Sequence, residues 1–146
     1  MPDNPTANDP ADVIDRWFEL FNGHDSARWS ECYAEDIVFE DVALQKTFKG
    51  REEMAEFMRV WVDACPDTLV ERGDIIIAGD RAAVAWNGKG TLLGHFSHLP
   101  ETAVRGSRID NRGLSIMEFA ENGLIRRQTD YYDVLNVLRQ IGVIPG

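Results

Sequence analysis

An aspartate close to the C-terminus has neighbours suited to acid and base chemistry. Asp130 lies in the run from Leu124 to Tyr132, which we expect to be a strand. Because side chains alternate along a strand, Gln128, Asp130 and Tyr132 share one face. Partial burial of that face would raise the pKa of Asp130 and let it exchange protons near neutral pH. The alternative is an acid at the end of a strand, paired with one of the nearby arginines.

Other side chains could hold a substrate beside this acid. Trp86 offers an indole that stacks on flat molecules, and His95 offers an imidazole that exchanges protons near neutral pH. Arg108 belongs to a group of arginines flanking the last two expected strands, where a guanidinium could neutralise an enolate or hold a carboxylate. The alternatives are a core aromatic for Trp86, an exposed strand edge for His95 and a solvated cross-strand ion pair for Arg108.

Three helices are predicted in the first half of the chain. Asp9 and Pro10 form a start signal for the first, and Asp25 can cap a short second one that carries Trp29, Cys32 and Tyr33. The third keeps apolar residues at helical spacing from Met54 to Val62 and ends before Pro66. Ile37 to Phe39 reads as a short strand between the second and third helices.

The second half of the chain has the texture of a sheet. We expect strands at Leu69 to Ala78, Ala82 to Leu93, Arg105 to Phe119 and Leu124 to Tyr132, with hairpin signals at Gly79-Asp80 and Asn122-Gly123. Asp133 can cap a last short helix. The predicted fold class is α+β, with three N-terminal helices on a curved antiparallel sheet and a short C-terminal helix.

Composition sets wider limits. The 146 residues, 44% of them hydrophobic, fit one domain, which we place at residues 9–146 after a disordered segment of residues 1–8. A net charge of −10 argues against nucleic-acid or membrane-surface partners, and no apolar run is long enough to span a membrane, so a cytoplasmic protein is expected. Cys32 and Cys65 are expected to be buried and reduced. The three histidines form no cluster at ligand spacing, which argues against a metal site.

The order of motifs in the last 60 residues resembles SnoaL-like polyketide cyclases, in the superfamily of nuclear transport factor 2 and ketosteroid isomerase. The resemblance rests on three segments: Gly90-Thr91-Leu92-Leu93-Gly94, then Ser115 to Phe119, then Asp130-Tyr131-Tyr132-Asp133 with Leu138 to Pro145 after it. It implies a cone-shaped pocket that works without metal or organic cofactor, a small hydrophobic substrate and a homodimer or higher homo-oligomer. Asp130 then corresponds to the catalytic aspartate of an intramolecular aldol condensation.

A second, shorter resemblance concerns Asp41. The stretch from Cys32 to Asp41 looks like the start of ketosteroid isomerases, and Asp41 falls where their proton-shuttling aspartate lies. The alternative is a loop acid near the mouth of the pocket. We therefore take Asp130 and Asp41 as candidate catalytic residues, and Trp86, His95, Gln128, Tyr132 and Arg108 as candidate substrate-binding residues.

The chain departs from the cyclase pattern where histidines are usual. Leu92 stands just after the Gly-Thr pair, and Gln128 stands two residues before Asp130. Glutamine can orient a carboxylate but cannot titrate, so the proton relay differs from that of the family. Open alternatives to aldol cyclisation are ketosteroid-type isomerisation or dehydration, epoxide hydrolysis through Arg108, Asp110 and Asp130, and a non-catalytic binding module.

Overall fold

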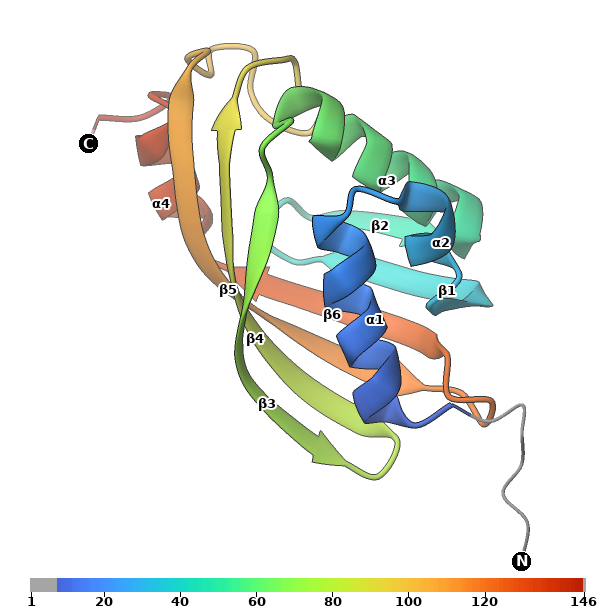
Figure 1. Ribbon diagram of the computed structural model, residues 1–146. Coiled ribbons are helices and arrows are strands. Elements are labelled where there is room, and N and C mark those ends of the chain that lie inside the picture. Colours follow the sequence, from blue (N-terminus) through green and yellow to red (C-terminus); the bar gives the residue numbers. More distant parts are fainter. Residues whose placement is uncertain (1–7, 146) are drawn as a thin grey trace, which may run out of the picture.

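The computed structural model describes residues 8–145, in which helices cover the concave face of a curved six-stranded sheet (Figure 1). The strands are β1 (Tyr33–Asp41), β2 (Lys46–Lys49), β3 (Leu69–Ala78), β4 (Arg81–Leu92), β5 (Ser107–Phe119) and β6 (Ile125–Tyr132). Their order in the sheet is β2-β1-β6-β5-β4-β3. The α+β prediction is confirmed.

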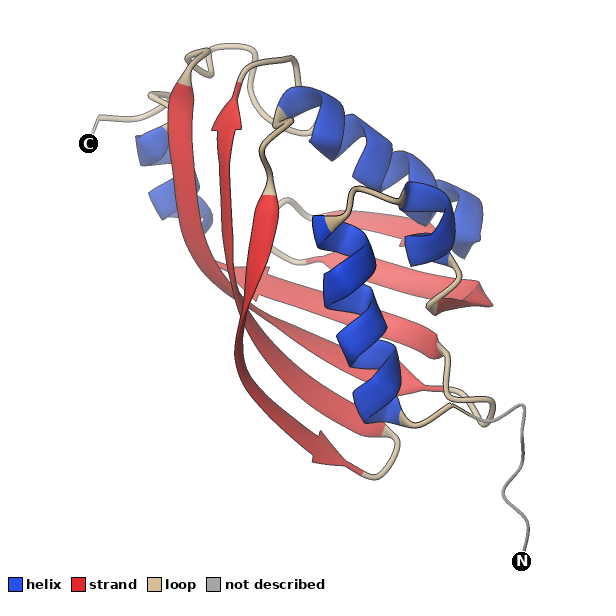
Figure 2. Cartoon of the chain, viewed as in Figure 1, coloured by secondary structure: helices blue, strands red, loops and turns tan. Residues whose placement is uncertain are grey.

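One pairing in the sheet departs from a simple antiparallel meander. Strand β1 runs parallel to β6, whereas the other neighbours are antiparallel (Figure 2). The parallel register sets Asp41 opposite Asp130. Two acids that are far apart in the sequence therefore lie on adjacent strands.

The helices are α1 (Pro10–Asn22), α2 (Ser26–Ser30), α3 (Gly50–Ala64) and α4 (Val134–Gln140). Three predicted caps are confirmed, because the carboxylates of Asp9, Asp25 and Asp133 accept hydrogen bonds from backbone N–H groups in the first turns of α1, α2 and α4. The second helix is shorter than expected. It ends at Ser30, so Tyr33 begins β1 instead of lying on the helix.

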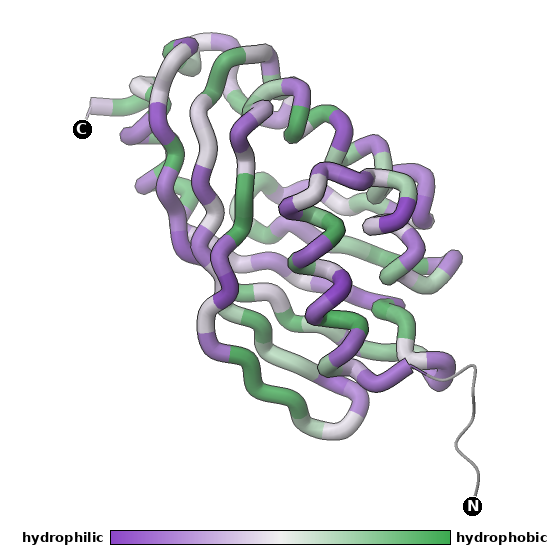
Figure 3. The backbone as a smooth tube through the Cα atoms, viewed as in Figure 1, coloured by the Kyte–Doolittle hydropathy of each residue, from purple (hydrophilic) through white to green (hydrophobic). Residues whose placement is uncertain are grey.

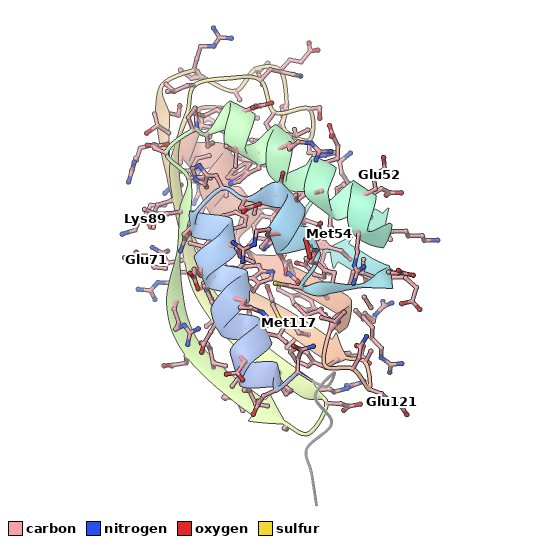
Figure 4. All side chains as sticks on the ribbon, turned by 45° about the vertical axis from the view of Figure 1, so that its right-hand side comes forward. Glu52, Met54, Glu71, Lys89, Met117 and Glu121 are labelled. Carbon is pink, nitrogen blue, oxygen red and sulfur yellow. The ribbon has the colours of Figure 1, made fainter. Side chains whose placement is uncertain are left out.

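The core lies between the helices and the inner face of the sheet. Figure 4 shows Met54 of α3 and Met117 of β5 within this layer, and both are fully buried. Glu71 and Lys89 lie on the other side of the sheet, where their charged groups are 2.7 Å apart. Alternation along each strand thus separates an apolar inner face from an outer face that carries ion pairs.

Part of the outer face is apolar. The second half of β3 forms a continuous hydrophobic run in Figure 3, and Ile76 within it is 68% exposed. Ile76 is paired across the sheet with Ala83, which in turn is paired with Ile116. Tyr131 on β6 is 48% exposed.

Three smaller predictions concern the ends and the cysteines. Residues 1–7 of the predicted disordered segment lie outside the described part, while the backbone N–H of Asn8 donates to the carbonyl of Asn122 at 3.0 Å. Cys32 and Cys65 are free and buried as predicted, and burial raises the pKa of the Cys65 thiol to about 12. Within residues 8–145, helices long and apolar enough to cross a membrane are absent.

Candidate active site

An apolar cavity lies between the helices and the inner face of the sheet. The space in it that the centres of water-sized molecules can reach is about 140 Å³. Aromatic side chains from several elements form much of its wall, among them Trp17, Phe21, Trp29, Phe57, Trp61 and Trp86. The few polar side chains that reach it include Asp41, Asn111, Gln128, Asp130 and Tyr132.

Asp130 projects from β6 into this cavity. Ser115 of β5, its cross-strand partner, donates from Oγ to Asp130 Oδ1 at 2.6 Å, and Gln128 Nε2 donates to the same oxygen at 2.9 Å. Among residues 8–145 no donor reaches the other oxygen, Oδ2. The carboxyl is therefore held through one oxygen while the second is available to a ligand.

Burial dominates the protonation of Asp130. Removal of water raises its pKa from 3.8 to about 7, and the nearby charge of Asp41 also raises the pKa. The hydrogen bonds from Ser115 and Gln128 act in the opposite sense, because they stabilise the ionised form. The carboxyl edge still borders the open cavity, so it is partly accessible while enclosed by protein. A carboxyl with such a pKa exists in both protonation states near neutral pH.

Two chains of hydrogen bonds run toward Asp130. In the first, Trp17 Nε1 donates to the Tyr33 hydroxyl at 2.8 Å, and that hydroxyl donates to Gln128 Oε1 at 2.7 Å. In the second, Trp86 Nε1 donates to Ser115 Oγ at 2.9 Å. An indole N–H can only donate, so each chain has a fixed direction that ends on Asp130 Oδ1.

This direction determines where a proton can be carried. Oδ1 already accepts two hydrogen bonds, which occupy its lone pairs. A proton taken up by Asp130 therefore goes to Oδ2, the oxygen without a protein donor among the described residues. The network thus makes Asp130 an acid or base with one working oxygen.

Asp41 is a second acidic residue in the cavity wall. It is only 3% exposed, and it accepts from the backbone N–H of Leu44 and from the Tyr132 hydroxyl, both at 2.9 Å. Burial raises the pKa of Asp41, whereas these two hydrogen bonds lower it. Both oxygens are engaged, so Asp41 is less free than Asp130 to meet a ligand.

Trp86 can lie flat across the sheet because the neighbouring strand carries a glycine there. A Cβ atom at Gly113 would lie 2.2 Å from the Trp86 ring. The ring centroids of Trp86 and Tyr132 are 6.2 Å apart and the ring planes are tilted by 49°, so the two aromatic side chains are neighbours in the wall that Asp130 also lines. The proposed stacking role of Trp86 is compatible with this position.

Two of the seven candidate site residues lie away from the main cavity. His95 is exposed and lines a smaller hollow in the loop after β4, and Arg108 is exposed and pairs with Asp67 at 3.3 Å. Strand alternation explains the outward position of Arg108, because the inward residues of β5 are Ile109, Asn111, Gly113 and Ser115. The relay of Arg108, Asp110 and Asp130 is not assembled for the same reason.

Sequence reasoning missed three residues that contribute to the site. Ser115 and Asn111 could have been found from the sequence. They are four residues apart, so they share one face of the strand that pairs with the strand of Asp130. Tyr33 was not detectable, because its bond to Gln128 joins positions 95 residues apart. Among the described residues, no three His, Cys, Asp or Glu side chains come together as metal ligands would.

Comparison with solved structures supports the fold. TsrD from Streptomyces laurentii is 20% identical with a TM-score of 0.78, covering 99% of this chain and 100% of that one. A protein from Jannaschia sp. CCS1 assigned as a SnoaL-like polyketide cyclase is 19% identical with a TM-score of 0.75, covering 99% of each chain. The epoxide hydrolase/cyclase-like enzyme SalBIII, which takes part in pyran ring formation in the polyether salinomycin, is 18% identical with a TM-score of 0.70. The match covers 87% of this chain and 92% of SalBIII.

A family model gives the stronger assignment. No curated protein matches the chain. The model of the SnoaL-like domain, however, matches residues 14–128, from within α1 to the middle of β6. The chain therefore belongs to the SnoaL-like domain family.

Proposed function

We propose that the protein is a cofactor-independent enzyme that uses Asp130 as acid and base on a hydrophobic, polyketide-like or polycyclic substrate. The observation that carries the proposal is the Asp130 carboxyl, with a pKa of about 7. It lines an apolar cavity, with one oxygen held by two donors and the other without a donor among residues 8–145. Membership of the SnoaL-like family and the apolar, aromatic lining of the cavity support the same substrate class.

The reaction we favour is an intramolecular aldol cyclisation. Asp130 Oδ2 takes the proton from a carbon next to a carbonyl group, and the C–H electron pair becomes an enolate. The enolate carbon attacks a second carbonyl of the same molecule and forms the new C–C bond. The resulting alkoxide then takes the proton back from Oδ2, so the carboxylate is regenerated and no co-reactant is needed.

Each residue around Asp130 has a separate part in this scheme. Ser115 and Gln128 keep the carboxyl in place, while the Trp86 ring offers a flat face on which the substrate can stack, with the tilted Tyr132 ring beside it. The apolar wall excludes water, which would otherwise protonate the enolate before it attacks. The same acid could also serve isomerisation or dehydration, because both begin with a proton transfer at carbon.

Product analysis by mass spectrometry tests the proposal. Wild type, Asp130→Asn and Asp110→Asn are incubated without cofactor with polyketide esters, 3-ketosteroids and epoxides. We expect Asp130→Asn to lose turnover by a factor on the order of a hundred or more, the usual scale for a positioned acid or base. Asp110→Asn removes an acid from outside the cavity and should retain full turnover. Equal turnover by wild type and Asp130→Asn would remove Asp130 from the mechanism.

A binding module is the second candidate. The hydrogen-bond donors to Asp130 favour it. Ser115 and Gln128 do not titrate near neutral pH, so neither can exchange a proton with the acid. Ligands that raise the melting temperature of the wild type, with no product from any of them, would support this candidate over catalysis.

We further propose that a second copy of the chain covers the outer sheet face. The exposed apolar side chains of Ile76 and Tyr131 on that face support this, because a sheet face of this kind is a liability in an isolated monomer. Sedimentation velocity would show a dimer or higher oligomer for the wild type, and a lower mass for Tyr131→Glu. Sedimentation of the wild type as a monomer would contradict the proposal.

A further inference from the structure

Asn111 is a polar residue in an otherwise apolar part of the cavity wall. It lies on the inner face of β5, is 6% exposed, and has Ile109 and Val137 among its neighbours in the lining. Its carboxamide is a polar group at the end of the cavity where α4 packs against β5. A polar side chain placed in such a wall needs a hydrogen-bond partner.

Contacts with α4 fix the orientation of this amide. Asn136 Nδ2 donates to the backbone carbonyl of Asp110 at 3.3 Å, and a carbonyl oxygen can only accept. The same Nδ2 lies 2.9 Å from the Asn111 side chain, so Asn111 must present Oδ1 to it. Gln140 strengthens the junction, because its Nε2 also donates to the Asp110 carbonyl at 2.9 Å.

The consequence is an unused donor that faces the cavity. With Oδ1 turned toward α4, Asn111 Nδ2 makes no hydrogen bond to an acceptor within residues 8–145. Its N–H groups can be satisfied by an oxygen of a bound ligand. Because Asp41 and Asp130 place negative charge along the same cavity, an uncharged acceptor suits the position better than a carboxylate.

The spacing along β5 defines the ligand further. Asn111 and Ser115 lie four residues apart on one face, which corresponds to about 13 Å along a strand. Ser115 marks the position of Asp130, and Gly113 between them leaves room for the flat Trp86 ring. One ligand could therefore stack on Trp86 and reach both polar points.

We propose that Asn111 is a binding subsite for a carbonyl oxygen of the substrate, several ring widths from the carbon that meets Asp130. The cavity would then select an elongated, uncharged molecule with a carbonyl group at its far end. The choice of substrate rests on the proposed function, but the subsite itself is a binding property that needs no turnover.

Binding of three matched probes tests the subsite. These are 2-acetylnaphthalene, which offers only an acceptor, 1-(2-naphthyl)ethanol, which can also donate, and 2-isopropylnaphthalene, which can do neither. Kd values are measured by quenching of tryptophan fluorescence at pH 8.5, where Asp130 is ionised and cannot donate to a carbonyl. For wild type we expect the ketone to bind about three- to tenfold more tightly than the hydrocarbon, the effect of one net hydrogen bond.

Variants separate the subsite from general packing. Asn111→Leu keeps a side chain of similar size and should bind ketone and hydrocarbon equally, whereas Asn87→Ala, which changes an amide on the outer face, should keep the preference. Asn136→Asp presents only acceptors to Asn111. The Asn111 amide should then turn its Oδ1 into the cavity, so that the alcohol binds more tightly than the ketone.

The outcomes are distinguishable from a failure of catalysis. The ketone preference should persist in Asp130→Asn, whether or not the wild type turns over any substrate. Loss of the preference in Asp130→Asn, its persistence in Asn111→Leu, or equal binding of ketone and hydrocarbon by wild type would overturn the subsite. If Asn111→Leu does not fold, unchanged ligand selectivity in Asn136→Asp overturns it instead.

Discussion

At the scale of residues, the site depends on the few side chains that surround the Asp130 carboxyl. Asp130, Gln128, Tyr132 and Trp86 could be selected from the sequence, because strand alternation and residue type are enough to place them on one face. The direction of the hydrogen bonds could not, since it depends on Trp17 and Tyr33, which only the folded chain brings to Gln128.

Removal of the Ser115 hydroxyl should change the acidity of Asp130. The Ser115 hydrogen bond lowers the pKa of Asp130 by stabilising the carboxylate, so in Ser115→Ala that pKa rises above its value of about 7. A hydrogen bond to a charged group contributes roughly 1.5–3 kcal/mol, so the rising limb of kcat/KM should move up by about one pH unit or more.

The measurement is the pH dependence of kcat/KM for a substrate identified by the product analysis. Ser107→Ala, on the same strand but bonded to the Val104 carbonyl outside the cavity, is the control and should leave the limb in place. A limb that stays where it is in Ser115→Ala, or moves to lower pH, would show that this hydroxyl does not tune Asp130.

At the scale of elements, the sheet creates the site by register. The four long strands and the caps of three helices follow from turn signals and alternation in the sequence. The parallel pairing of β1 with β6 does not, because nothing local distinguishes it from an antiparallel one. That pairing is what brings Asp41 beside Asp130 and lets the charge of Asp41 raise the pKa of Asp130.

The pairing of β4 with β5 gives a test at this scale. In Gly113→Ala the new Cβ would collide with the Trp86 ring at 2.2 Å, so the ring must move and its bond to Ser115 is lost. We expect a loss of about 1–3 kcal/mol in the free energy of unfolding, together with a shifted tryptophan emission.

Gly88→Ala is the matched control for that change. Gly88 also lines the cavity, but its new Cβ would lie 3.5 Å from the Trp86 ring, an ordinary contact. Urea unfolding followed by fluorescence compares the two variants. Equal stability of Gly113→Ala and Gly88→Ala would contradict the close packing of the Trp86 ring on Gly113.

At the scale of the whole molecule, the buried acid must make folding depend on pH. The pKa of Asp130 is about 7 in the folded chain against an ordinary value of 3.8, so the folded state binds more protons between these values. The contribution of Asp130 to the free energy of unfolding is therefore fully present below about pH 4 and is lost as pH rises to about 7.

Asp130→Asn isolates that contribution. The variant should gain stability relative to wild type as pH rises from about 4 to 7, by at most about 4 kcal/mol, and the difference should be constant above pH 8. Urea unfolding at a series of pH values measures it, with Asp110→Asn as a variant that should follow the wild type. A difference between wild type and Asp130→Asn that does not vary with pH would contradict burial as the cause.

The most direct test of the account is the titration of Asp130 itself. In protein labelled with ¹³C at the aspartate Cγ, the resonance that disappears in Asp130→Asn identifies this carboxyl, and its chemical shift is followed from pH 4 to 9. We expect a midpoint of about 7 for this resonance. A midpoint below about 5 would show that Asp130 is an ordinary ionised aspartate and would contradict its role as acid and base.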